Sequence, residues 1–73
     1  MAHLEPPVSQ PPHVDAVVHR QDRDECRPAI ITRVNDDGSV NLTEFGPGGA
    51  VPYIRVVQDD VQGSWHWRRE GCR

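Results

Sequence analysis

The sequence predicts an all-β fold: a small five-stranded barrel resembling the Src-homology-3 architecture, behind an extended proline-rich N-terminal arm. Short segments rich in β-branched residues alternate with turn residues at a spacing of roughly eight to twelve residues, which is typical of small barrels and sandwiches. No window keeps a helical period of apolar residues over two turns. Several prolines gather at the N-terminus, where no strand pattern is present.

The arm comprises residues 1–13 and contains Pro6, Pro7, Pro11 and Pro12 among polar residues. Proline fixes φ and has no N–H to donate, so we expect an extended, polyproline-like segment without a core, disordered when alone. Two interpretations stay open: a solvated tail, or an arm that lies across a neighbouring subunit.

The β domain is expected over residues 14–68, followed by a tail of residues 69–73. Its first strand is predicted from Val14, because apolar and polar residues alternate there with the two-residue period of a half-buried strand. Residues 20–27 are mostly charged and predict a loop. Residues 29–34 are β-branched and predict the second strand.

The later strands are marked by turn residues. Residues 35–38 end in Asp-Gly, the strongest short-range signal of a β-hairpin, and residues 39–45 form the partner strand. A glycine-rich turn then leads to a fourth strand over residues 51–57. Pro52 cannot donate to a ladder, so this strand is expected to begin at a sheet edge. Residues 64–67 are the predicted fifth strand.

Size and charge restrict the function classes. The chain has 73 residues and a net charge of −3, with arginine as its only fixed cation. This balance argues against generic nucleic-acid binding, which depends on neutralising phosphates. A core this small rarely supplies more than about 3–5 kcal/mol, so self-association or a protein partner is expected. No signal peptide and no apolar membrane span are visible, which predicts a cytoplasmic protein without membrane contact.

The segment Trp65-His66-Trp67 is the most unusual part of the sequence. In a strand, the two indoles share one face and the imidazole takes the other. The indoles could cover one end of the core, or they could form a stacking platform for a small ligand or a partner's side chain. The candidate binding residues are Trp65, His66, Trp67, Arg68, Arg27 and His19.

Four residues are candidates for metal binding, and two of them are the chain's cysteines. His19, Cys26, His66 and Cys72 are zinc ligands by type, but no C-x-x-C or H-x-x-x-H pair anchors them. A closed site would need the fold alone to bring all four together, so we expect no metal and no cofactor. Two free thiols are the expectation for a cytoplasmic chain, with a disulfide between Cys26 and Cys72 as the alternative.

Catalytic motifs are not assembled in the sequence. Ser64 and His66 would share a strand face, but no carboxylate is placed to orient the imidazole. The glycines of residues 46–49 lack the strand-then-helix context of a phosphate loop. A protein without enzymatic activity is therefore expected.

Four stretches together resemble a group of short uncharacterised proteins of actinobacteria and their bacteriophages. They are a Val-Val-His strand, residues 26–34, residues 40–43 and the ending Gly-x-Trp-His-Trp of residues 63–67. The chain departs from the group at Arg68, where proline is usual, and at Pro28, where alanine is usual. The resemblance implies a phage or prophage context and carries no established activity.

Taken together, the sequence favours a non-enzymatic binding or accessory protein acting in the host cytoplasm, with a small ligand or a host protein bound near the Trp-His-Trp segment. The alternative is a structural protein of the virion that decorates or joins it through the N-terminal arm.

Overall fold

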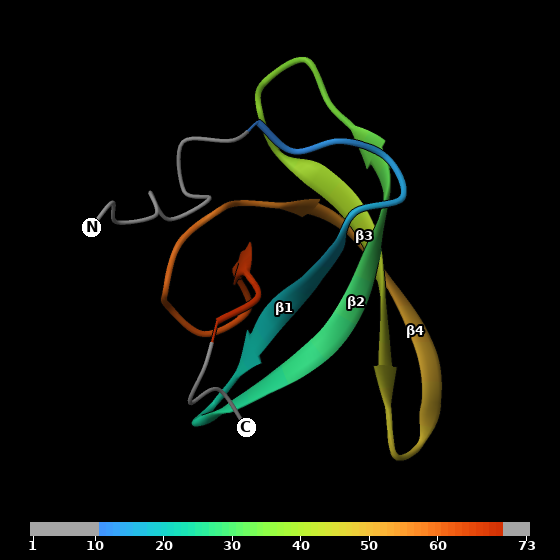
Figure 1. Cartoon of the computed structure of the whole chain (residues 1–73), viewed down its shortest axis with the longest axis vertical. Helices are drawn as coiled ribbons and strands as arrows, with labels where there is room; N and C mark the ends of the chain where they lie inside the picture. The colour runs from blue at the N-terminus through green and yellow to red at the C-terminus, as the bar shows by residue number, and fades with distance from the viewer. Residues whose placement is uncertain (1–10, 70–73) are drawn as a thin grey trace, which may run out of the picture.

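The computed structural model describes residues 11–69, and all of their regular structure is β. The strands are β1 (Val17–Asp22), β2 (Glu25–Val34), β3 (Val40–Gly46), β4 (Gly49–Val56) and β5 (Trp65–Trp67). They form one antiparallel sheet in the order β4-β3-β2-β1-β5, which is strongly curled (Figure 1). The prediction of an all-β fold with five strands is confirmed.

Most of the predicted arm and nearly all of the predicted tail lie outside the described residues. Within residues 11–69 there is no helix long and apolar enough to cross a membrane.

The first hairpin differs from the prediction at both ends. β1 begins at Val17 and not at Val14, because residues 14–15 form a turn in which Asp15 has a φ of 78°. Residues 20–27 are not a loop, since β1 continues to Asp22 and β2 already begins at Glu25. A tight turn at residues 23–24 joins the two strands.

The charges that suggested a loop stabilise the hairpin instead. Arg27 contacts Asp22 at 3.3 Å and Glu25 at 2.8 Å. Gln62 also ties the hairpin to the loop before β5: it accepts a hydrogen bond from the Arg23 N–H and donates one to Asp22. This end of the hairpin extends beyond the apolar core, so neither face is fully buried and the two-residue hydrophobic period is lost.

The second and third hairpins follow the predicted turns. Asp37 accepts hydrogen bonds from the backbone N–H of Ser39 at 2.9 Å and from its hydroxyl at 2.6 Å, and Gly38 has the positive φ of 91° that the turn requires. β3 and β4 then pair up to Gly46 and Gly49. β4 is an edge strand of the sheet, as Pro52 predicted.

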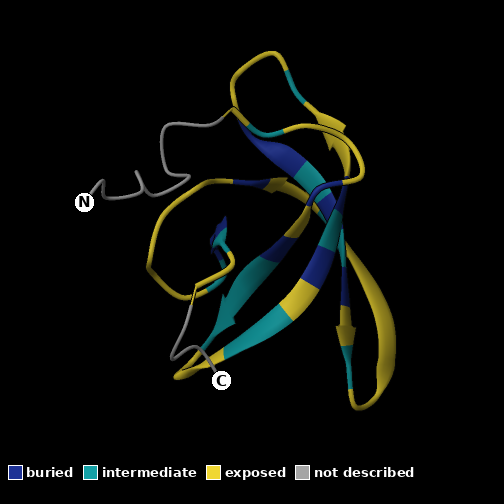
Figure 2. Ribbon diagram, in the orientation of Figure 1, coloured by how far each residue is buried: buried dark blue, intermediate teal, exposed yellow. Residues whose placement is uncertain are grey.

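The apolar core lies on one face of the curled sheet. Its buried members come from every strand or from the residues beside them, and Figure 2 shows them concentrated where the strands cross. Tyr53 and Trp67 pack against the core at partial exposure. The buried core residues are Ala16, Val18, Ala29, Ile31, Val40, Leu42, Val56 and Trp65.

Trp65 connects the two ends of the sheet. β5 pairs with β1 on one side, with Trp65 opposite Arg20. On the other side, the Trp65 N–H donates to the Val57 carbonyl at 2.9 Å, and the Asp59 N–H donates to the Trp65 carbonyl at 3.0 Å. The segment that follows edge strand β4 is thereby hydrogen-bonded to edge strand β5.

An ion pair also spans the core face. The Arg20 guanidinium on β1 donates to the Glu44 carboxylate on β3 at 2.8 Å, although β2 separates these strands. The two side chains are only 12 % and 9 % exposed. Arg20 also stacks over the Tyr53 ring of β4, 3.8 Å from its centroid. One side chain therefore contacts strands two and three places away across the curled sheet.

Replacing Trp65 should unfold the domain. The side chain is fully buried, and truncating a buried tryptophan costs about 3–5 kcal/mol, as much as a core of this size supplies. We expect Trp65→Ala to lose its cooperative unfolding transition in urea, followed by circular dichroism. Exposed Val61→Ala, the control, should shift the free energy of unfolding by less than about 0.5 kcal/mol. A cooperative transition in Trp65→Ala close to that of the parent chain would contradict this account of the core.

Replacing one partner of the ion pair should lower the free energy of unfolding more, per side chain, than replacing both partners together. Glu44→Gln leaves the Arg20 charge buried without its counter-ion, so we expect a loss of about 1–3 kcal/mol in the free energy of unfolding. The double variant Arg20→Met, Glu44→Met should lose less than the sum of the two single changes. Additive losses in chemical denaturation would show that the two side chains are not coupled.

Candidate functional site

Two histidines and a cysteine meet on the sheet face opposite the core. His19 of β1 and His66 of β5 are direct cross-strand partners, and their rings meet edge to face with centroids 5.6 Å apart. Cys26 of β2 lies on the other side of β1, with its Sγ 3.4 Å from the Nε2 of His66. One ligand atom from each of the three residues lies within 4.8 Å of the others.

Strand register explains why these three residues meet. His19 and Gln21 point to the same face of β1, since side chains alternate along a strand. His66 stands opposite His19 on one flank, and Cys26 stands opposite Gln21 on the other. Trp65 and Trp67 point to the core face. His66 between them therefore points to the opposite face, together with His19, as the alternation predicted.

Both imidazoles are held in the neutral form at neutral pH. Burial lowers the pKa of His19, and the charges of Arg68 and Arg69 lower it further. Burial is also the main cause of the lowered pKa of His66, helped by Arg69 and His19 and opposed by Asp60. A neutral imidazole keeps a lone pair on one ring nitrogen, which is the form that binds metals.

Cys26 is half-buried and disulfide-bonded, so the expectation of a free thiol is wrong for this residue. The chain's second cysteine, Cys72, lies outside the described residues. The Sγ of Cys26 is also 3.7 Å from the side-chain oxygen of Gln21. The sulfur therefore lies between one amide and one imidazole.

The two tryptophans of the predicted platform differ in burial. Trp65 is 0 % exposed and belongs to the core, whereas Trp67 is half-buried. Their rings meet edge to face with centroids 5.3 Å apart, and His13 lies beside Trp67 at 6.1 Å. A ligand could reach Trp67 but not Trp65 without opening the core.

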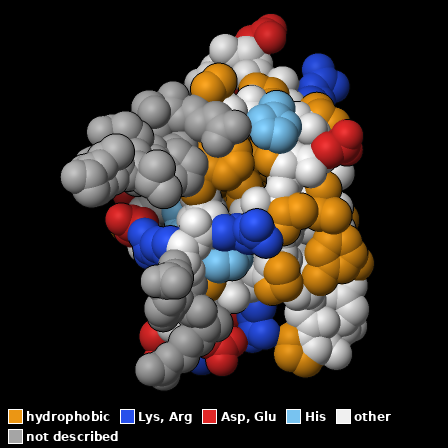
Figure 3. All heavy atoms as spheres, viewed as in Figure 1, with side chains coloured by type: hydrophobic (Ala, Val, Ile, Leu, Met, Phe, Trp, Pro, Cys, Tyr) orange, Lys and Arg blue, Asp and Glu red, His pale blue; other side chains and the backbone are white. Residues whose placement is uncertain are grey.

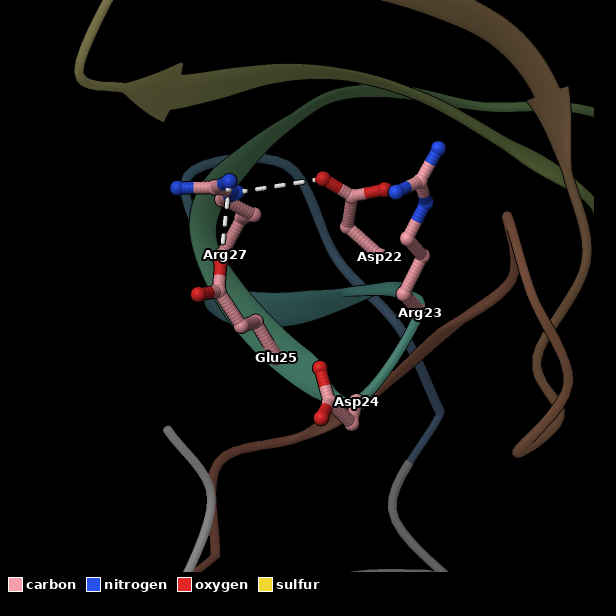
Figure 4. A pocket seen from close by; sticks show the side chains of 5 residues that line it. All are labelled: Asp22, Arg23, Asp24, Glu25 and Arg27. Atoms are coloured by element: carbon pink, nitrogen blue, oxygen red, sulfur yellow. Dashed lines mark hydrogen bonds and ion pairs between the residues drawn. The ribbon is translucent and has the colours of Figure 1, made fainter.

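The predicted arginines are separated from each other. Arg68 is exposed and follows β5 directly, and its charge contributes to the lowered pKa of His19. In Figure 3, histidine and arginine side chains lie together near the centre of the view. Arg27 lies instead at the tip of the first hairpin, between Asp22 and Glu25 (Figure 4).

The hairpin tip forms a shallow hollow of about 360 Å³. Its lining is charged, and Arg27 is already neutralised by two carboxylates. A hydrogen bond from Gln62 is the main cause that lowers the pKa of Asp22, followed by contacts with Arg27. Arg23 adds a second cation, but three carboxylates outnumber the two arginines, so the hollow does not favour an anionic ligand. Its lining residues are Asp22, Arg23, Asp24, Glu25 and Arg27.

Ser64 is not directed at His66. Its hydroxyl donates to the Val61 carbonyl at 2.6 Å and is buried in the turn before β5. The hydroxyl is thereby committed to the turn, and no serine–histidine pair forms.

A second surface, absent from the sequence-based candidates, lies along β4. Every residue of this strand except Tyr53 and Val56 is exposed, and Figure 2 shows the strand exposed along almost its whole length. Ile54 is 70 % and Val51 42 % exposed, and Phe45 of β3 is exposed beside them. Figure 3 shows hydrophobic side chains gathered over β3 and β4.

In comparisons with known proteins, no family model, no curated protein and no solved structure matches the chain.

The sequence named Cys26 as a zinc ligand by type but did not place it beside the two histidines, and the surface on β4 was not among the sequence-based candidates. Placing Cys26 beside the histidines required the register of the β1–β2 hairpin, and the charged residues 20–27 had predicted a loop there. The surface on β4 had a signal in the sequence. The spacing of Val51 and Ile54 breaks the two-residue period, which indicates that the apolar residues of this strand do not all face the core.

The histidines should make the domain less stable in weak acid. Because the pKa of His19 and of His66 is lowered from about 6.5 on folding, the unfolded chain takes up protons first as the pH falls. Stability should be constant above about pH 7 and decline from pH 6.5 towards pH 5.5, measured as the thermal midpoint. Asp22 and Asp37, whose pKa values are lowered from 3.8, act only at lower pH.

His19→Gln tests the assignment, since it removes one titrating group and keeps a polar side chain of similar length. Its decline between pH 7 and 5.5 should be shallower than that of the parent chain. Equal slopes in the two proteins would show that the cluster does not couple protonation to folding.

Proposed function

We propose that this chain is a non-enzymatic binding or accessory protein that acts as a self-associated module, with edge strand β4 as the contact between two copies. The observation that carries the proposal is an exposed, apolar edge strand on a very small domain. Pro52 and the irregular backbone at Arg55, whose φ is 54°, interrupt the ladder at this edge, but the apolar side chains of Val51 and Ile54 stay uncovered. An exposed apolar surface of this kind points to a partner.

The chemistry of β4 suits strand pairing. Arg55 is the single charged residue of the strand, and no acidic residue interrupts it. Its backbone N–H donates to the side-chain oxygen of Asn41, and its guanidinium lies 3.6 Å from Asp37. The charge is thus compensated within the chain, and the neighbouring apolar residues Val51 and Ile54 meet no competing charge.

A second copy of the chain is the occupant that fits best. Two β4 strands related by a two-fold axis would run antiparallel and present the same residues to each other, which makes the contact self-complementary. Apart from Pro52, which has no N–H, and Arg55, whose N–H already bonds Asn41, the pairing would satisfy backbone groups along the edge. It would cover Ile54 as well. It would also extend a core that is otherwise at the lower limit for a stable domain.

Side-chain contacts, the sequence resemblance and the burial of Trp65 further support a binding or accessory role. The commitment of the Ser64 hydroxyl to a turn, and of Arg27 to two carboxylates, favours binding over catalysis. The resemblance to short proteins of actinobacteria and their phages favours a phage or prophage context in the host cytoplasm. The burial of Trp65 favours a surface contact with a protein over a small ligand held between two indoles.

We also infer that the curled sheet is a small barrel of the Src-homology-3 type. Support comes from the hydrogen bonds between Trp65 and the segment after β4, and from the parallel bridge of Gln58 with Trp65. The contact of Arg20 with β3 and β4 supports the same strongly curled geometry.

The mass of the protein in solution tests whether two copies associate. Light scattering on the purified 8.2 kDa chain should give twice that mass, and Ile54→Glu should give a single copy because the carboxylate would be buried against its symmetry mate. Val61→Glu adds the same charge at an exposed valine outside β4 and should keep the doubled mass. A single-copy mass for the parent chain up to about 100 μM would refute the proposal, since biological contacts are usually tighter.

A further inference from the structure

We propose that His19, Cys26 and His66 form a zinc site in the reduced protein, with two imidazole nitrogens and one thiolate as ligands. The site lies on the opposite sheet face from the core and is built from β1, β2 and β5, so it is independent of the contact proposed along β4.

The spacing of the ligand atoms fits tetrahedral zinc. Zinc–nitrogen bonds of about 2.1 Å and zinc–sulfur bonds of about 2.3 Å put tetrahedral ligand atoms roughly 3.4–3.6 Å apart. The Sγ of Cys26 and the Nε2 of His66 are already 3.4 Å apart. All three ligand atoms fall within 4.8 Å, so His19 needs only a side-chain adjustment to complete three corners of a tetrahedron.

The ligand types select for zinc. Imidazole and thiolate together suit Zn²⁺, whereas Mg²⁺ and Ca²⁺ prefer oxygen ligands. The fourth corner is open to water or to another side chain of the protein.

His19 supplies a second, independent indication. Its Nδ1 is buried and has no hydrogen-bond partner among residues 11–69. A buried polar atom without a partner is uncommon in native proteins and calls for an explanation such as a missing ion. A metal bound at the ring would fix its tautomer and orientation.

Two arginines oppose the binding of a dication. Arg68 and Arg69 follow β5 directly and bring two positive charges to the strand that carries His66. Arg69 is paired with Asp60 at 2.9 Å, which compensates part of this charge, and the Cys26 thiolate compensates more. The balance favours a ligand set that includes the thiolate over one that uses the histidines alone.

The disulfide and the metal exclude each other at Cys26. In the disulfide state the sulfur has no thiolate to offer. A phosphine reductant transfers two electrons to the S–S bond, leaves two thiols and takes up an oxygen atom from water as the phosphine oxide. Zinc then displaces the thiol proton of Cys26. A cytoplasm rich in reducing thiols would likewise favour the metal-binding state.

Cobalt(II) is the probe that tests the site, because it replaces zinc and is coloured. The full chain, reduced with phosphine and freed of metal with a chelator, should bind one Co²⁺ per chain. The expected spectrum has a thiolate-to-cobalt charge-transfer band and intense visible bands of tetrahedral cobalt, and Zn²⁺ should displace both. Zn²⁺ should also raise the thermal midpoint of the reduced protein.

Variants assign the ligands. Cys26→Ser should abolish the charge-transfer band, and His19→Gln should weaken Co²⁺ and Zn²⁺ binding by at least tenfold. His13→Gln removes a histidine outside the cluster and should change nothing. His19 is only half-buried, so His19→Gln should stay folded even if a change at buried His66 does not.

Three results would overturn the proposal. They are a reduced parent chain without tetrahedral cobalt bands, a charge-transfer band that survives in Cys26→Ser, and equal affinity in His19→Gln and His13→Gln. None of these depends on the mass of the assembly, so the outcome is separate from that of the β4 contact.

Discussion

The hydrogen bonding of Trp65 is the constraint on which the remainder of the molecule depends. Its strand is the shortest in the sheet, yet it is bonded on one side to β1 and on the other to the segment after β4. The indole fills the core between them. The sheet is curled enough for Arg20 of β1 to touch Glu44 of β3 and Tyr53 of β4 across its core face.

β5 serves two faces at once. Trp65 anchors the core, and its neighbour His66 points the other way, against His19 and Cys26. The position of the histidine is therefore fixed by the packing of the adjacent tryptophan. A cluster on a three-residue strand would otherwise be poorly held, and rigid strands are better supports for a site than loops. The Trp-His-Trp segment thus contributes Trp65 to the core and His66 to the cluster on the opposite face.

The strands could be predicted from the sequence where one face is buried and turn residues flank the segment. Residues 29–34 and the turn at Asp37-Gly38 are examples, since both local signals agree there. The β1–β2 hairpin could not, because its outer half has no buried face and its charges pair across strands. The alternation of Trp65, His66 and Trp67 was predictable from strand geometry alone.

The cluster itself was only half predictable. Its residue types were recognisable, but His19 and His66 are 47 positions apart and share no spacing motif. Their meeting depends on which strands pair and in what register, and this is a property of the whole sheet. The same holds for the β4 surface, because the exposure of Ile54 follows from the position of its strand at an edge.

The closing strand also bears on how the chain reaches its fold. The hairpins β1–β2, β2–β3 and β3–β4 each join neighbours in sequence, whereas β5 returns to β1 across almost the whole domain. Contacts of such long sequence separation form late, because the entropy of closing the loop is lost before they form. Both tryptophans of the chain lie on β5. Intrinsic fluorescence is thus a built-in reporter of the last step of folding, separate from the formation of the hairpins.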